Sequence, residues 1–158
     1  MLPQHLTLLL YDAKIQDDTS SLLSLSMGSR LKAKQSSNKI SQIHAKYSQE
    51  ESQIQNQINE VSKSRKEASS VDNEESDSNS RAELLAQYEE LKDELKDLKN
   101  EEDTEVQKVE DETTAYENDV EIQKTTIETD LQATREDRSA IKDNLDQSIE
   151  DSFGYFSD

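Results

Sequence analysis

The fold is decided by the stretch from residue 81 to residue 156, which reads RAELLAQYEELKDELKDLKNEEDTEVQKVEDETTAYENDVEIQKTTIETDLQATREDRSAIKDNLDQSIEDSFGYF. It contains neither Gly nor Pro before Gly154. Its apolar residues recur mostly at alternating steps of four and three, a spacing that keeps them on one side of a helix. We therefore predict one long helix whose narrow apolar stripe, flanked by charged residues, has to pack against a partner helix.

The apolar seam of this helix is uneven. Its apolar members are Leu84, Tyr88, Leu91, Leu95, Leu98, Val106, Val109, Tyr116, Val120, Ile127, Leu131, Ile141, Leu145, Ile149, Phe153 and Phe156. Polar residues fall near positions where the spacing favours an apolar one, namely Glu102, Thr113, Lys124, Thr134 and Arg138. We expect residues 84–98 and 141–156 to anchor the helix and its middle to pack more loosely.

The first half of the chain supplies the partner. Residues 4–27 are the most apolar segment, and Pro3 suits the first turn of a helix. A second series, spaced seven apart, comprises Ala33, Ile40, Tyr47, Ile54, Val61 and Ala68, with Ile43 and Ile58 at neighbouring core positions. Glu50 and Gln57 fall at the other core position, so we expect a weak coiled coil. Gly28 either ends a separate first helix or lies within a continuous one at a cost of about 1 kcal/mol relative to Ala.

The polar run at residues 69–80 predicts the turn between the two arms. Its Ser, Asn and Asp side chains hydrogen-bond their own backbone and favour turns and helix caps. Ser80, followed three residues later by Glu83, matches a capping box and predicts the start of the long helix. Asp72, Glu74 and Asp77 do not make a calcium loop, because Gly at the sixth position and Glu at the twelfth are missing. We expect no metal site.

Composition and charge favour a hairpin. Only 30% of the 158 residues are apolar, too few for a thick core. Residues 1–66 carry nine basic and six acidic side chains, whereas residues 67–158 carry nine basic and thirty acidic ones. Arms of opposite sign favour pairing with each other, and we expect Lys32, Lys34, Lys39 and Lys46 to pair with the acidic arm. The prediction is an all-α fold, a long antiparallel helical hairpin or coiled coil. Its segments are an apolar N-terminal helix at residues 1–28, a first arm at residues 29–68, a polar loop at residues 69–80 and a long acidic arm at residues 81–158. If Gly28 breaks the first arm, residues 1–28 form a separate third helix.

Motifs that would carry catalysis are missing from the sequence. There is no Cys, hence no disulfide, thiolate nucleophile or Cys-based zinc site. His5 and His44 lie far apart and outside any metalloprotease motif, and neither a Gly-rich phosphate loop nor a nucleophile elbow occurs. We expect neither an enzyme nor a cofactor. Because an acidic surface repels phosphate, we also expect no nucleic-acid partner.

The N-terminal apolar run bears on localisation. Residues 6–11 follow no basic residue and precede no small-residue cleavage site, which argues against a signal peptide, and they are too few to span a bilayer. The polar face lacks a Lys/Arg cluster for binding a membrane surface. We expect a cytoplasmic protein or one exported without a cleaved signal.

A hairpin brings this N-terminal segment beside the aromatic C-terminus. We predict that self-assembly uses both ends, through Leu6, Leu9, Leu10, Ile15, Leu22, Leu25, Ile149, Phe153, Tyr155 and Phe156. Burial of the N-terminal helix in the packing of its own chain is the simpler interpretation of the same leucines. The two functional hypotheses are a structural self-assembling protein and an acidic coiled-coil adaptor or export chaperone with one protein partner.

Residues 143–156, DNLDQSIEDSFGYF, end the charged heptads in an Ile-x-x-x-Phe-x-x-Phe tail. In this the chain resembles uncharacterised bacterial coiled-coil proteins with such a tail. Its plan of apolar N-terminal helix, polar middle and long C-terminal helix is similar to the helical-hairpin subunits of secreted bacterial filaments, such as type III secretion needle and sheath proteins and the inner helices of flagellins. The resemblance implies a filament subunit or a secretion-associated subunit. The very acidic C-terminal arm departs from those families.

Overall fold

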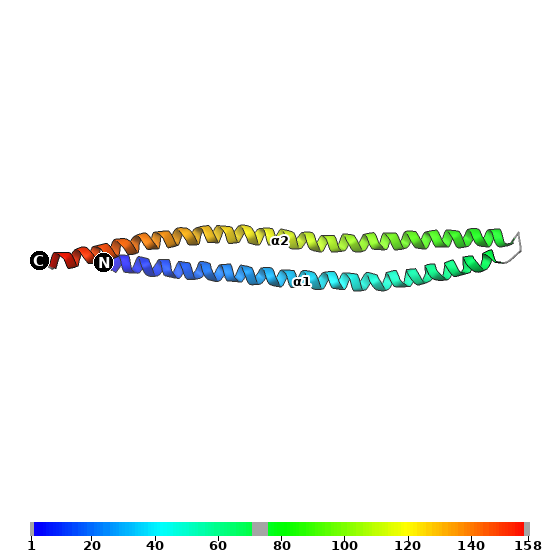
Figure 1. The fold of residues 1–158 in the computed structure, drawn as a ribbon, viewed down its shortest axis with the longest axis horizontal. Helices are drawn as coiled ribbons and strands as arrows, with labels where there is room; N and C mark the ends of the chain where they lie inside the picture. The colour runs from blue at the N-terminus through cyan, green and yellow to red at the C-terminus, as the bar shows by residue number, and fades with distance from the viewer. Residues whose placement is uncertain (1, 71–75, 157–158) are drawn as a thin grey trace. The chain divides into compact units, whose positions relative to one another are not determined.

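The computed structural model describes the backbone of residues 2–70 and 76–156, and the side chains of residues 4–70 and 79–154. Two helices account for nearly all of this. Helix α1 spans Leu2–Ser69 and helix α2 spans Ser76–Phe156. They pack against each other as a helical hairpin, which confirms the predicted all-α fold (Figure 1).

Helix α1 continues through Gly28. No described residue has a positive φ, and Gly28 is helical like its neighbours. The separate third segment is therefore not formed. A Cβ atom built at Gly28 would lie 3.0 Å from the Tyr116 hydroxyl oxygen, so the missing side chain lets that hydroxyl approach the α1 backbone.

The chain forms two compact units. Unit 1 comprises residues 1–33 and 114–158, the first part of α1 and the last part of α2. Within it, the Arg138 Nε donates to Asp12 Oδ1 at 2.5 Å, and Lys14 Nζ donates to Asp130 at 3.0 Å. Because the partner numbers fall on α2 as they rise on α1, the two segments run antiparallel.

Unit 2 comprises residues 34–113, the remaining parts of both helices and the connection between them. Here the Ser36 hydroxyl bonds the Thr113 hydroxyl, and the Arg65 guanidinium lies 5.0 Å from the centre of the Tyr88 ring. These contacts again descend on α2 as they ascend on α1, so the helices of this unit are also antiparallel.

The seam of α2 follows the predicted spacing of threes and fours. The apolar members assigned from the sequence are half-buried or buried from Leu84 to Ile149. The assignment of Phe153 to the seam is wrong, because its side chain is 71% exposed, and the side chain of Phe156 lies outside the described residues. The five polar residues expected to interrupt the seam, from Glu102 to Arg138, also lie half-buried or buried on it. Thr134, for example, is only 3% exposed, and its hydroxyl bonds the Asp130 carbonyl one turn earlier. A threonine that satisfies its own hydroxyl in this way can occupy a seam position without an unpaired polar group.

The seam of α1 follows the sequence prediction at most positions and departs from it at three. Ile40, Tyr47, Ile54 and Val61 are half-buried or buried. Three other predictions are wrong, because the side chains of Ala33, Glu50 and Gln57 are exposed. At these levels the seam uses Ser36, Glu51 and Ile58, and of these only Ile58 was predicted at a core position, which its burial confirms. A strict seven-residue repeat drifts around a helix of 3.6 residues per turn, and two successive steps of four bring the seam back to the facing side.

The core is thin, as expected for two helices. The buried apolar side chains are Tyr47, Ile58, Val120, Leu131 and Leu145, between 3% and 7% exposed, and none of the described side chains is less than 2% exposed. Each helix thus hides one stripe and leaves its other faces in solvent.

The connecting end of unit 2 differs from the prediction. Helix α2 begins at Ser76, so Ser80 lies inside it and is not its N-cap. The Arg81 side chain reaches across to the Ala68 carbonyl at 3.2 Å, while the Ser69 and Ser70 hydroxyls bond the carbonyls of Lys66 and Glu67. These bonds satisfy carbonyl groups that a helix C-terminus otherwise leaves without a partner. The candidate calcium ligands Asp72, Glu74 and Asp77 lie outside the residues whose side chains are described.

Candidate assembly surface

Among the described residues, six of the nine exposed large apolar side chains lie on α1 in unit 1, on the side of the helix opposite its seam. We call this surface the outer stripe; its members are Leu6, Leu9, Leu10, Leu23, Met27 and Leu31. Their exposed fractions range from 54% to 71%. Adjacent residues are about 100° apart around a helix, so positions two residues from a seam position lie almost opposite it. Six large apolar side chains on one exposed face exceed the scattered singles of an ordinary surface.

The outer stripe is almost uncharged. The α1 part of unit 1 carries three basic and three acidic side chains, whereas the α2 part carries four basic and twelve acidic ones. Of the acidic residues of the α1 part, Asp18 lies half-buried in the seam, and Asp12 pairs with Arg138. Unit 1 therefore presents an apolar, nearly neutral helix on one side and a strongly acidic helix on the other.

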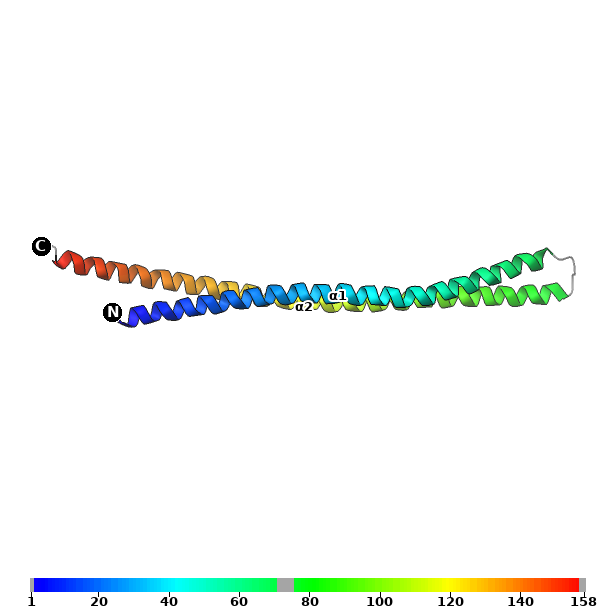
Figure 2. The same ribbon diagram turned by 90° about the horizontal axis from the view of Figure 1, so that it is seen from below.

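The C-terminal end of α2 forms a second exposed apolar site. In both views α2 extends beyond the start of α1, so its last turns have no α1 segment beside them (Figures 1 and 2). Ile149 is half-buried, and Phe153 is 71% exposed. Tyr155 and Phe156 belong to the helix, but their side chains lie outside the described residues.

The structure separates the predicted assembly residues of α1 into two groups. Leu6, Leu9 and Leu10 lie in the outer stripe. Ile15, Leu22 and Leu25 are half-buried and belong to the seam of the hairpin. The sequence analysis missed Leu23, Met27 and Leu31, although their steps of four place them on a common helix face.

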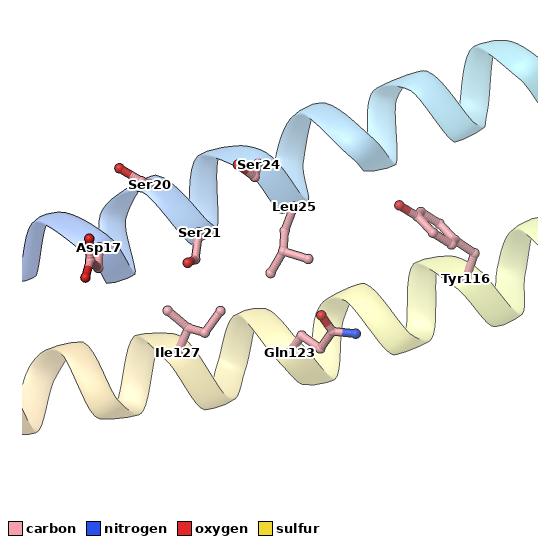
Figure 3. Close-up of a pocket in the computed structure, with 8 residues that line it drawn as sticks. All are labelled: Asp17, Ser20, Ser21, Ser24, Leu25, Tyr116, Gln123 and Ile127. Carbon is pink, nitrogen blue, oxygen red and sulfur yellow. The ribbon is translucent and has the colours of Figure 1, made fainter. Parts of the chain in front are cut away.

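An open groove of about 730 Å³ runs between α1 and α2 in unit 1. Small polar side chains of α1 leave it open, since Ser20, Ser21 and Ser24 line it with Asp17. Figure 3 shows Leu25 and Ile127 pointing from the two helices toward each other. Asp17 is the one charged side chain among the eight that line it, so the groove has no pair of groups for acid-base chemistry.

Unit 2 contains a polar site within its seam, made by Glu51, Glu102 and His44, which we call the polar seam. His44 Nδ1 lies 2.6 Å from Glu102 Oε1. Hydrogen bonding to Glu102, followed by burial, raises the pKa of the Glu51 carboxyl, while hydrogen bonds from Glu51 and His44 lower the pKa of Glu102. The Glu51 Oε1 atom is buried and accepts no hydrogen bond from the described residues. Protonated Glu51 donating to ionised Glu102 accounts for both pKa shifts.

One turn away, Tyr47 is 3% exposed and donates its hydroxyl to Glu105 Oε1 at 2.8 Å. This bond to a carboxylate, together with burial, raises the pKa of Tyr47 to about 12. The tyrosine thus holds its proton at any physiological pH and ties α1 to α2 in unit 2.

The predicted pairing of the α1 lysines with the acidic arm is wrong. Among the described residues, the ion pairs are Lys14–Asp130, His44–Glu102 and Arg138–Asp12. Lys32 and Lys46 lie instead over the rings of Tyr116 and Tyr47, at 5.8 and 5.1 Å from their centres. Long side chains that cross the seam edge in this way cover apolar surface while their ammonium groups stay in water.

The described residues contain no group of three or more His, Asp or Glu side chains placed to hold a metal ion. Nor does any helix among them combine the length and apolarity needed to cross a membrane. Neither a protein-family model, nor a curated protein sequence, nor a solved structure matches the chain.

Proposed function

We propose that this chain is a structural protein that assembles with copies of itself through helix packing, as a subunit of a bacterial filament or a secretion-associated assembly. The observation that carries the proposal is the outer stripe of α1, six large apolar side chains exposed on a nearly uncharged helix face. A soluble hairpin has no structural need of such a face, because its own seam lies on the other side.

The energetics favour association. Fully burying a Leu or Met side chain contributes roughly 1.5–3 kcal/mol, so hiding the remaining 54–71% of each contributes about 1–2 kcal/mol. Six such side chains in each of two copies give on the order of 12–24 kcal/mol. Association costs roughly 4–15 kcal/mol in lost translational and rotational freedom, so the stripe can hold two copies together at attainable protein concentrations.

Growth beyond a pair needs a second, different surface, because a contact that uses the same patch on both partners closes after two copies. The C-terminal end of α2, with Phe153 71% exposed, is such a surface. It lies on α2, whereas the outer stripe lies on α1. With these two contact surfaces, each copy can bind two others, and the assembly can grow beyond a pair.

The test is a pair of acidic substitutions in the outer stripe. Leu10→Glu with Met27→Glu should leave the helix content unchanged, because both side chains are exposed and Glu favours helix, and should reduce the assembled fraction at least tenfold in light scattering. Ile122→Glu is the matched control, since Ile122 is 66% exposed on α2 outside the stripe. Equal loss of assembly in the control, or full assembly of the double variant, would contradict the proposal.

A second function is favoured by the acidic face of α2. With twelve acidic and four basic side chains in unit 1, that face suits an adaptor or export chaperone for a basic helical partner. Such a protein stops at a small oligomer as its concentration rises, whereas a filament subunit continues to grow.

A further inference from the structure

We infer that the outer stripe pairs with the outer stripe of a second copy in the antiparallel direction, with the two-fold axis passing between Asp17 and Ser20. This inference rests on the proposed self-assembly and specifies its partner and its geometry. It makes unit 1 of two chains a four-helix bundle with the two α1 segments inside.

Four members of the outer stripe, Leu6, Leu10, Met27 and Leu31, lie on a series of exposed positions that has the spacing of a second coiled-coil seam, and Leu9 and Leu23 flank this series. Starting at Leu6, the exposed positions of this face advance by four and three in strict alternation and end at Leu31. Such a series reads the same in both directions. An antiparallel copy therefore places Leu6 opposite Leu31 and Leu10 opposite Met27, which buries large apolar side chains against each other.

The centre of this series is small and polar, and it fits the same register. Ala13 falls opposite Ser24, and Asp17 falls opposite Ser20. All four side chains are exposed in the single hairpin, and Asp17, Ser20 and Ser24 also border the open groove toward α2. In a parallel pair each Asp17 would instead face the Asp17 of the second copy. Like charges at facing seam positions repel, so the antiparallel direction is the one that the charges favour.

The charges also favour α1 of a second copy of this chain as the helix that covers the outer stripe. The α2 segment of unit 1 has an excess of eight acidic side chains over basic ones, which opposes contact between α2 segments of two copies. The α1 segment has no excess. Packing α1 on α1 thus joins the apolar faces while both acidic helices stay on the outside in water.

The chain has no Cys, so introduced thiols report the direction of pairing without interference. We would prepare Ala13→Cys and Ser24→Cys as separate full-length proteins with tags of different size, mix them and oxidise them. Antiparallel pairing predicts a mixed disulfide at least tenfold more abundant than either disulfide between identical chains. Ala13→Cys mixed with Gln16→Cys is the matched control. In the antiparallel register Gln16 lies about 12 Å along the helix from the position opposite Ala13, beyond the reach of a disulfide.

The outcomes distinguish the inference from the proposal beneath it. Predominant disulfides between identical chains would show parallel pairing, and a control mixture that cross-links as well as the test mixture would show an unspecific contact. Either result overturns the inference, as does a protein that light scattering shows to be assembled but in which neither mixture cross-links. A protein that stays monomeric in light scattering overturns the proposed self-assembly itself.

Discussion

Replacement of Gly28 by Ala tests how α1 and α2 meet in unit 1. Glycine in a helix interior is about 1 kcal/mol less favourable than alanine, so a continuous α1 should gain stability from the substitution. The new methyl group, however, would lie 3.0 Å from the Tyr116 hydroxyl oxygen. That oxygen is the tip of a half-buried, movable side chain, so the contact should cost only part of the gain.

We expect Gly28→Ala to raise the free energy of unfolding by about 0.5 kcal/mol in the natural background and by about 1 kcal/mol when Tyr116 is also replaced by Phe. The second background removes the atom that the methyl group meets. The measurement is urea denaturation followed by circular dichroism on the four proteins of the double-mutant cycle. Gly154→Ala serves as the control, because a Cβ there meets nothing within 4 Å and should show no coupling to Tyr116.

Destabilisation by 1 kcal/mol or more in both backgrounds would refute the reasoning. It would mean that the chain needs glycine at this position for a backbone conformation other than helix, and that α1 is two segments. Equal gains in the two backgrounds would leave α1 continuous but would contradict the close approach of Tyr116.

Three further predictions concern the polar seam, the core and the C-terminal end. Because the folded chain raises the pKa of Glu51, the stability that this carboxyl contributes is present at acidic pH and is lost as the pH rises through its raised pKa. Glu51→Gln should therefore stabilise the hairpin at pH 7, by about 0.5 kcal/mol. The difference in stability from the natural protein should shrink as the pH falls through the raised pKa of Glu51 and should be gone below about 4.5, the ordinary pKa of the carboxyl. A difference that grows toward acid would contradict the shared proton. Leu145→Ala removes a side chain that is only 4% exposed and should lower the free energy of unfolding, measured by thermal unfolding, by about 2–4 kcal/mol. Ile122→Ala removes one that is 66% exposed and should lower it by less than about 0.5 kcal/mol. Similar losses in the two variants would argue against the seam. Replacing Phe153 and Phe156 by Ala should abolish growth beyond small oligomers in light scattering, while the helix signal in circular dichroism is mostly retained. Intact growth, or melting of the hairpin, would show that the C-terminal end is not an assembly surface.

Much of the fold follows from spacing alone. The steps of three and four in residues 81–156, the polar run after residue 68 and the contrast of charge between the arms predict two antiparallel helices, and the structure has them. Even Glu102 and Thr134, two polar residues at seam positions of α2, lie where the spacing predicts them, because the period of the helix continues whatever residue occupies a position.

Local details were harder to predict. Ser76, Asp77, Ser78, Asn79 and Ser80 can all cap a helix, so a capping box at Ser80 could not by itself fix where α2 begins. The shift from Glu50 to Glu51 in the α1 seam arises from the packing of two real helices, which a fixed seven-residue count ignores.

The assembly surface was predicted in part, for a similar reason. Any apolar residue near the N-terminus could belong to the hairpin seam or to an outward face, and only the partner helix decides which. Leu22 and Leu23 are neighbours of the same type, yet Leu22 is half-buried in the seam and Leu23 is 62% exposed. With α2 in place, the leucines divide into an inner and an outer set.

The most direct test of self-assembly is the molar mass of the natural protein by size-exclusion chromatography with light scattering, over a wide range of concentration and at low and moderate salt. Because the chain has a net charge of −18, salt should weaken repulsion between copies, so we expect a mass that rises past the dimer with concentration and rises further with added salt. A mass that stays at the 18.0 kDa of one chain under all these conditions would contradict self-assembly.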